Sequence, residues 1–138
     1  MTEIKLKRLS GFRCELSNSL GKTAIIDGSK SIGGTEDGLR PMELLLMGLA
    51  GCSGFDVLSI LQKGRQDVRD FEVTVKGERA ETVPAVFTRI LVHYEVSGPV
   101  ELAKLERAVS LSLEKYCSVS AMLGKTAKIE STCAVRPG

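Results

Sequence analysis

The chain has 138 residues, 19 basic and 17 acidic side chains and a formal net charge of +2, so its length suits one domain and bulk charge does not select a nucleic-acid partner. Hydrophobic residues make up 43% and charged residues 26%, which are ordinary values for a globular protein and exclude disorder and fibrous repeats. Aromatic residues make up only 4% and Trp is absent, so an aromatic platform for stacking single-stranded bases is not expected.

Strand patterns open the chain. Apolar residues alternate with polar ones at Phe12, Cys14 and Leu16, and residues 22–27 form a further short apolar strand. We therefore predict a small antiparallel meander. Residues 28–40 are rich in Gly, Ser, Thr and Asp, which predicts a connection longer than the usual loop of about 4 to 6 residues.

A long helix is predicted from Pro41 to about Lys63, because Pro suits a first helical turn, Glu43 suits the positive end of the helix dipole and Gly64 ends the pattern. Its longest uncharged run has 12 residues, fewer than the roughly 20 that span a membrane, so we expect a core helix. Its apolar residues surround most of the helix, and a helix that is apolar all round must be covered all round. We expect a second copy of the chain to cover the far side in a homodimer.

The remaining pattern predicts a strand hairpin, an amphipathic helix, a short helix and a final strand. The amphipathic helix should bury a stripe that includes Leu102, Leu105, Val109 and Tyr116. The predicted order is βββ-α-ββ-α-α-β, in one domain over residues 1–138. Grouped strands indicate an α+β class with antiparallel sheets on the long helix rather than a doubly wound parallel sheet.

The first nine residues alternate Lys with apolar residues and lack the apolar stretch of a signal peptide, so we expect a cytoplasmic location. The four cysteines form no C-x-x-C pair, and a reducing compartment would keep them as thiols. Cys14 and Cys133 lie on apolar strand faces and are expected in the core. His93 lies on the polar face of its strand and is expected in solvent.

Several common sites are not indicated. The two Gly-Lys-Thr triplets, at residues 21–23 and 124–126, lack the upstream glycine of a phosphate-binding loop. With one His and no paired cysteine spacing, a zinc site would need four scattered ligands. We therefore expect no cofactor and no metal.

Two cysteines have features of reactive thiols, although packing remains an equal alternative for both. Cys52 lies among three glycines of the long helix, which suggests a close neighbour or substrate. Cys117 precedes the short helix, whose free N–H groups would stabilise a thiolate. Asp56 is one turn after Cys52 and would raise the pKa of its thiol, so we expect a nearby cation, with three arginines as candidates, Arg13, Arg40 and Arg65.

Two motifs resemble the OsmC/Ohr family of stress-response thiol proteins: residues 41–45 (PMELL) with residues 50–53 (AGCS), and residues 114–119 (EKYCSV). The resemblance covers essentially the whole chain. Residues 57–68 (VLSILQKGRQDV) are similar to the YhfA-type branch of this family. Either motif alone would be a weak match, but the two cysteine motifs together, 65 residues apart, make the match specific.

The resemblance implies an intertwined homodimer with active sites near the interface, and reduction of organic hydroperoxides without metal, haem or flavin. Cys52 would be the peroxidatic cysteine and Cys117 the resolving one, and a lipoyl-type dithiol or small thiol would restore the pair. The peroxidase branch has a glutamate directly after the motif proline, where this chain has Met42, so Glu43 is only a tentative catalytic residue. Met42 and Asp56 favour the alternative of a stress protein that binds a small molecule without peroxidase activity.

Overall fold

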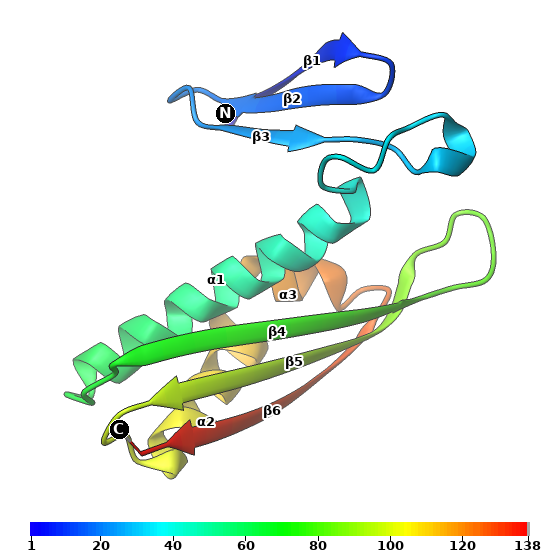
Figure 1. Ribbon diagram of the computed structural model, residues 1–138. Coiled ribbons are helices and arrows are strands. Elements are labelled where there is room, and N and C mark those ends of the chain that lie inside the picture. The colour runs from blue at the N-terminus through cyan, green and yellow to red at the C-terminus, as the bar shows by residue number, and fades with distance from the viewer. Residues whose placement is uncertain (138) are drawn as a thin grey trace. The chain divides into compact units, whose positions relative to one another are not determined.

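The structure, a computed structural model that describes residues 1–137, confirms the predicted α+β class and the predicted order of elements (Figure 1). The strands are β1 (Ile4–Ser10), β2 (Arg13–Asn18), β3 (Thr23–Ile26), β4 (Asp70–Arg79), β5 (Phe87–Ser97) and β6 (Lys128–Arg136). The helices are α1 (Pro41–Lys63), α2 (Leu102–Leu111) and α3 (Ser118–Leu123). Two short turns complete the fold, the 3₁₀ turn η1 (Lys30–Ile32) and the π-helical turn η2 (Ser112–Tyr116).

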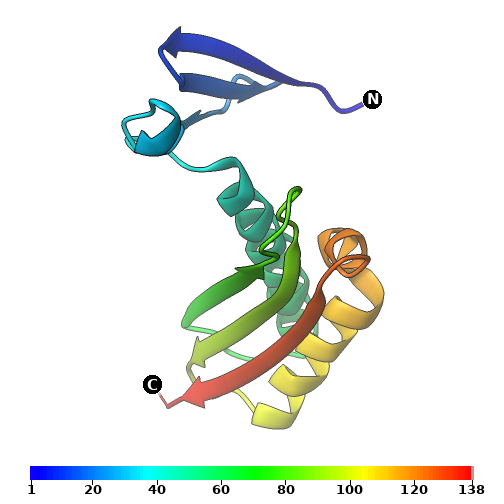
Figure 2. The same cartoon turned by 90° about the vertical axis from the view of Figure 1, so that its right-hand side faces the viewer.

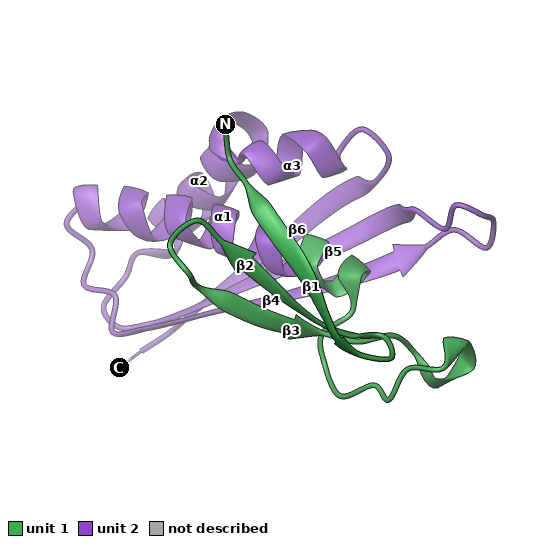
Figure 3. Ribbon diagram, turned by 90° about the horizontal axis from the view of Figure 1, so that it is seen from above, with its two compact units in different colours: residues 1–45 green, residues 46–138 purple. Residues whose placement is uncertain are grey.

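Internal contacts divide the chain into two compact units, residues 1–45 and the segment from Leu46 onward (Figure 3). The predicted single domain therefore stays a prediction. The first unit contains the antiparallel sheet β1-β2-β3, which confirms the predicted meander. Cys14 and Leu16 are half-buried, whereas Phe12 precedes β2 and is exposed.

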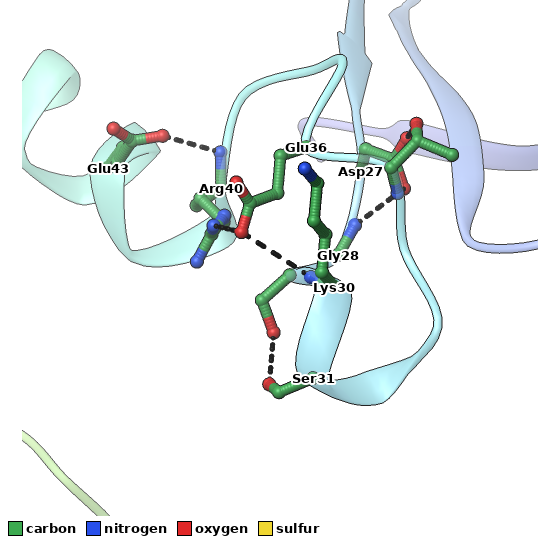
Figure 4. Close-up of polar contacts among 9 residues, drawn as sticks. Asp27, Gly28, Lys30, Ser31, Glu36, Arg40 and Glu43 are labelled. Carbon is green, nitrogen blue, oxygen red and sulfur yellow. Dashed lines mark hydrogen bonds and ion pairs between the residues drawn. The ribbon is translucent and has the colours of Figure 1, made fainter.

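The connection between β3 and α1 is held by polar contacts (Figure 4). The buried Asp27 carboxylate accepts hydrogen bonds from the Thr35 hydroxyl at 2.5 Å and from the Gly28 N–H at 2.7 Å. The Thr35 hydroxyl is the main reason that the pKa of Asp27 lies below its ordinary value of 3.8, because burial acts in the opposite direction. This segment is therefore an ordered structure built around one carboxylate.

The second unit contains the sheet β4-β5-β6, which is mixed rather than antiparallel. β4 and β5 pair as the predicted antiparallel hairpin, but β6 is parallel to β5, so the prediction of antiparallel sheets is wrong for this strand. The reason is the connection: α2, η2 and α3 carry the chain back to the start of β5, as a parallel pair requires.

One face of this sheet is covered by α1 beside β4 and by α2 beside β6 (Figures 1 and 2). The core between them is made of side chains that alternate along β5 and that recur at helical spacing on α1 and α2. Its most buried members are Leu49, Val57, Leu61, Ile90, Val92, Tyr94, Val96, Leu105 and Ala108. His93 points to the opposite face, where Nδ1 is 2.6 Å from Thr132 Oγ1, so the prediction of a solvent-facing histidine is confirmed.

The buried stripe predicted for the second helix is confirmed in the middle of the stripe and is wrong at its two ends. Leu105 and Val109 are buried, but Leu102 and Tyr116 are about half exposed. Leu102 is the first residue of α2, and the π-helical turn adds a residue to the last turn, which rotates Tyr116 away from the stripe.

Helix α1 has the predicted bounds and is buried on one side only. The side that includes Phe55 is open: Phe55 is 75% exposed, and a Cβ added at Gly48 or Gly51 would meet nothing within 4 Å. α1 is long and apolar enough to cross a membrane, but a single such helix is weak evidence, because core helices of soluble proteins share these properties. The dimer predicted from this helix stays a prediction.

Candidate active site

The structure brings Cys52 and Cys117 together in the second unit. Cys52 is half-buried on α1, and Cys117 is 3% exposed between η2 and α3. Both are free thiols, and Cys52 is near enough to Cys117 to contribute to the raised pKa of the Cys117 thiol. Two cysteines 65 positions apart in the sequence therefore meet through the packing of α1 against the η2–α3 junction.

The Cys117 thiol is held as a neutral group. Burial is the largest effect and, together with the neighbouring Cys52, raises the pKa of Cys117 to about 11. Cys117 is also the N-cap of α3, and its Sγ accepts a hydrogen bond from the Ser120 N–H at 3.3 Å, which acts in the opposite direction. The predicted contact with free helix N–H groups is confirmed, but it does not outweigh burial.

A chain of buried hydroxyl groups begins at Ser53, the residue that follows Cys52. The Ser112 Oγ is 2.9 Å from Asp56 Oδ2 and 2.9 Å from the Ser53 Oγ, and the Ser53 Oγ is hydrogen bonded to the Tyr94 hydroxyl. Ser53, Ser112 and Tyr94 are fully buried. We call these four residues, Asp56, Ser112, Ser53 and Tyr94, the hydroxyl chain. It joins α1, β5 and the end of α2.

The Ser112 hydroxyl is the centre of the hydroxyl chain. It is placed to donate to Asp56 Oδ2 and to the Ser53 Oγ, and the Ser53 and Tyr94 hydroxyl groups share a further hydrogen bond. Burial raises the pKa of Tyr94 to about 12, so its phenol keeps its proton.

Sequence reasoning missed Ser53, Ser112 and Tyr94. The sequence contains a weak signal for two of them. Ser112 follows Leu105 and Val109 at helical spacing on the buried side of the second helix. Tyr94 lies on the same strand face as the apolar Val92 and Val96. A serine at an apolar position is a candidate for a buried hydrogen bond, because a buried hydroxyl requires a partner.

Asp56 differs from its predicted surroundings. We expected a cation beside its carboxylate, but in the second unit its hydrogen-bond partner is the Ser112 hydroxyl. Two of the arginine candidates form ion pairs within the first unit, Arg13 with Asp37 and Arg40 with Glu36.

Glu43 stabilises the start of its own helix. Its Oε1 accepts a hydrogen bond from the Arg40 N–H at 2.8 Å, while the Arg40 guanidinium contacts Glu36 at 2.9 Å (Figure 4). A carboxylate in the first turn satisfies one of the free N–H groups there. The tentative catalytic role of Glu43 stays a prediction.

Cys133 lies at the register position opposite Tyr94, and its pKa is raised by burial and by the charge of Glu106 on α2. It is half-buried, as is Cys14 in β2. Both positions match the expected packing role more than an exposed reactive site.

The chain is similar in sequence and in fold to known proteins. The sequence is 42% identical to Protein YhfA of Escherichia coli K12 over 128 residues, 92% of each chain. The crystal structure of a hypothetical protein from Aquifex aeolicus VF5 matches with a TM-score of 0.88 at 38% identity, over 100% of this chain and 98% of that one. An organic hydroperoxide resistance protein OsmC from Legionella pneumophila shares the fold, with a TM-score of 0.75 at 17% identity over 98% and 97% of the two chains. The sequence profile described as OsmC-like protein matches residues 34–132, and this chain therefore belongs to the OsmC-like protein family.

Proposed function

We propose that the protein is a thiol-dependent peroxidase that reduces organic hydroperoxides with Cys52 and Cys117, as part of a stress response. The observation that carries the proposal is the meeting of these two thiols in one site. Membership of the OsmC-like family supports it, because structural neighbours include proteins described as organic hydroperoxide resistance proteins.

The two cysteines have different roles in this proposal. Cys52 is the more accessible, so its thiolate attacks the distal oxygen of the hydroperoxide, and the O–O bond breaks. The departing alkoxide takes a proton and leaves as an alcohol, and Cys52 becomes a sulfenic acid. The Cys117 sulfur then attacks the Cys52 sulfur, water leaves, and a disulfide forms. An external lipoyl-type dithiol or small thiol returns the pair to two thiols.

The apolar surroundings of Cys52 favour alkyl hydroperoxides over hydrogen peroxide. α1 is rich in leucine before Cys52, and the exposed Phe55 follows it by three residues. Apolar walls bind a hydrophobic substituent more strongly than a substrate that lacks one.

The active form in this proposal is a cytoplasmic homodimer. Gly48, Gly51 and Phe55 lie on one open side of α1, and this side combines small residues with an exposed aromatic ring. Monomeric proteins rarely leave such a surface uncovered, and a second copy of α1 fits it by twofold symmetry.

Thiol counting with cumene hydroperoxide tests the reaction. One equivalent should consume two thiols per chain, and mass mapping should find a Cys52–Cys117 disulfide. Cys52→Ser should abolish the reaction, whereas Cys117→Ser should leave a Cys52 sulfenic acid that dimedone traps. Cys14→Ser and Cys133→Ser are matched controls and should react like the parent protein.

The placement of Glu43 favours a second candidate, a stress protein that binds a small molecule without peroxidase activity. Its carboxylate is already bonded to the Arg40 N–H, and Met42 occupies the place of the glutamate in the peroxidase branch. An unchanged thiol count after cumene hydroperoxide would support this candidate and contradict the peroxidase.

A further inference from the structure

We propose that the hydroxyl chain is a positioning device that holds Cys117 against Cys52, with Ser112 as its central residue, so that the disulfide closes rapidly once Cys52 is oxidised. This inference rests on the thiol pair of the proposed function. It assigns a role to four residues outside the pair itself.

Ser112 connects the segment that carries Cys117 to the helix that carries Cys52, and it does so through different atoms. Its side chain contacts α1 at Asp56 Oδ2 and at the Ser53 Oγ, both at 2.9 Å. Its main-chain carbonyl accepts the Cys117 N–H at 2.7 Å, which is the i to i+5 bond of the π-helical turn. One residue therefore fixes the start of the segment that ends at Cys117 to the helix that carries Cys52.

The other members of the hydroxyl chain prevent this connection from shifting. Ser53 is the neighbour of Cys52 in the sequence, and Asp56 is one turn further along α1. Tyr94 adds a third element, the central strand β5, and its ring is fully buried. Because the hydrogen bonds of the chain connect three elements, they limit how far the segment that carries Cys117 can shift against α1.

The π-helical turn η2 is the segment that joins Ser112 to Cys117. Such turns are uncommon and occur often at functional sites. Here the turn carries a buried thiol from the end of α2 to the N-cap of α3, where Ser120 N–H contacts the sulfur. Since a shift of about 1 Å between reacting groups costs about a hundredfold in rate, a segment held at both ends is suited to closing a disulfide.

The reaction has two steps, and only the second depends on the position of Cys117. In the first, Cys52 thiolate, hydroperoxide and a proton give Cys52 sulfenic acid and an alcohol, which needs no contact with Cys117. In the second, Cys52 sulfenic acid and the Cys117 thiol give the disulfide and water. A defect in the hydroxyl chain should slow the second step and leave the first unchanged.

The experiment uses the full chain with Cys14→Ser and Cys133→Ser, so that only the pair remains. Its disulfide is equilibrated with reduced and oxidised glutathione, a readout that does not depend on peroxidase activity. Ser112→Ala should lower the equilibrium constant for the disulfide by about tenfold or more and, with cumene hydroperoxide, should increase the dimedone-trapped sulfenic acid. Ser110→Ala, at an exposed serine of α2 two residues earlier, is the matched control and should change neither quantity.

Conservative variants separate positioning from general destabilisation. Asp56→Asn keeps an oxygen that accepts a hydrogen bond from Ser112, so the equilibrium constant for the disulfide should stay close to that of the parent protein. Asp56→Ala removes this acceptor and should lower the constant as much as Ser112→Ala does. If Ser112→Ala does not fold, Tyr94→Phe tests the same chain with the ring in place. Equal constants for Ser112→Ala and Ser110→Ala would overturn the inference. A different result would separate the two proposals. If hydroperoxide leaves the thiols unchanged but Ser112→Ala still lowers the equilibrium constant for the disulfide, the peroxidase function is refuted and the positioning role is not.

Discussion

Replacing Phe55 with alanine tests whether a second copy of the chain covers α1. Burying a whole Phe side chain contributes about 3 kcal/mol, and 75% of Phe55 is exposed, so covering it contributes about 2 kcal/mol per protomer. In a twofold-symmetric dimer the loss counts twice. Phe55→Ala should therefore weaken dimerisation by about 4 kcal/mol, which is about a thousandfold in the dissociation constant.

Analytical ultracentrifugation over a range of protein concentrations measures this constant. Alanine is a better helix former than phenylalanine, so a weaker dimer would not result from loss of α1. Leu102→Ala, at a half-exposed leucine on α2, is the control and should leave the constant unchanged. A Phe55→Ala protein that dissociates like the control would refute the reasoning.

Three further outcomes follow from the structure. The pKa of Cys117, about 11, lies above its ordinary 9.0, so the folded state holds this proton more tightly than the unfolded state does. The contribution to the unfolding free energy is complete below about pH 9 and is lost as the pH rises toward 11. Cys117→Ser should therefore make the unfolding free energy, measured with urea, fall less steeply over that range. Gly77→Ala places a Cβ 2.5 Å from the buried Phe87 ring and should lower the unfolding free energy by about 1 to 3 kcal/mol in the same assay. Thr35→Val removes the main hydrogen bond that lowers the pKa of Asp27, so that pKa should rise in a carboxyl NMR titration.

Local signals were sufficient for the bounds of α1. Proline at a first helical turn and glycine after a last one are strong local preferences, and α1 begins at Pro41 and ends before Gly64 as expected. The alternation along β5 likewise predicted that His93 lies on the face away from the core. These features depend on neighbours in the sequence, so they could be predicted from it.

Contacts between distant segments were harder to predict. No local pattern records that β6 pairs parallel to β5, because strand direction depends on the path of the intervening helices. The π-helical turn before Cys117 also has no signal in apolar spacing. Serine is common on surfaces, so the burial of Ser53 and Ser112 could not be predicted from residue type.

The surroundings of the two sulfur atoms also explain why the pair should react in one order. With a pKa of about 11, only about one Cys117 side chain in ten thousand is ionised at pH 7, so Cys117 is a poor first nucleophile. Its pKa is raised by burial and, in addition, by the hydrogen bond and the charge of Cys52. Burial is the largest of these causes and does not change when Cys52 becomes a sulfenic acid. Cys117 is therefore suited to act second, on the oxidised sulfur beside it, rather than first on the peroxide.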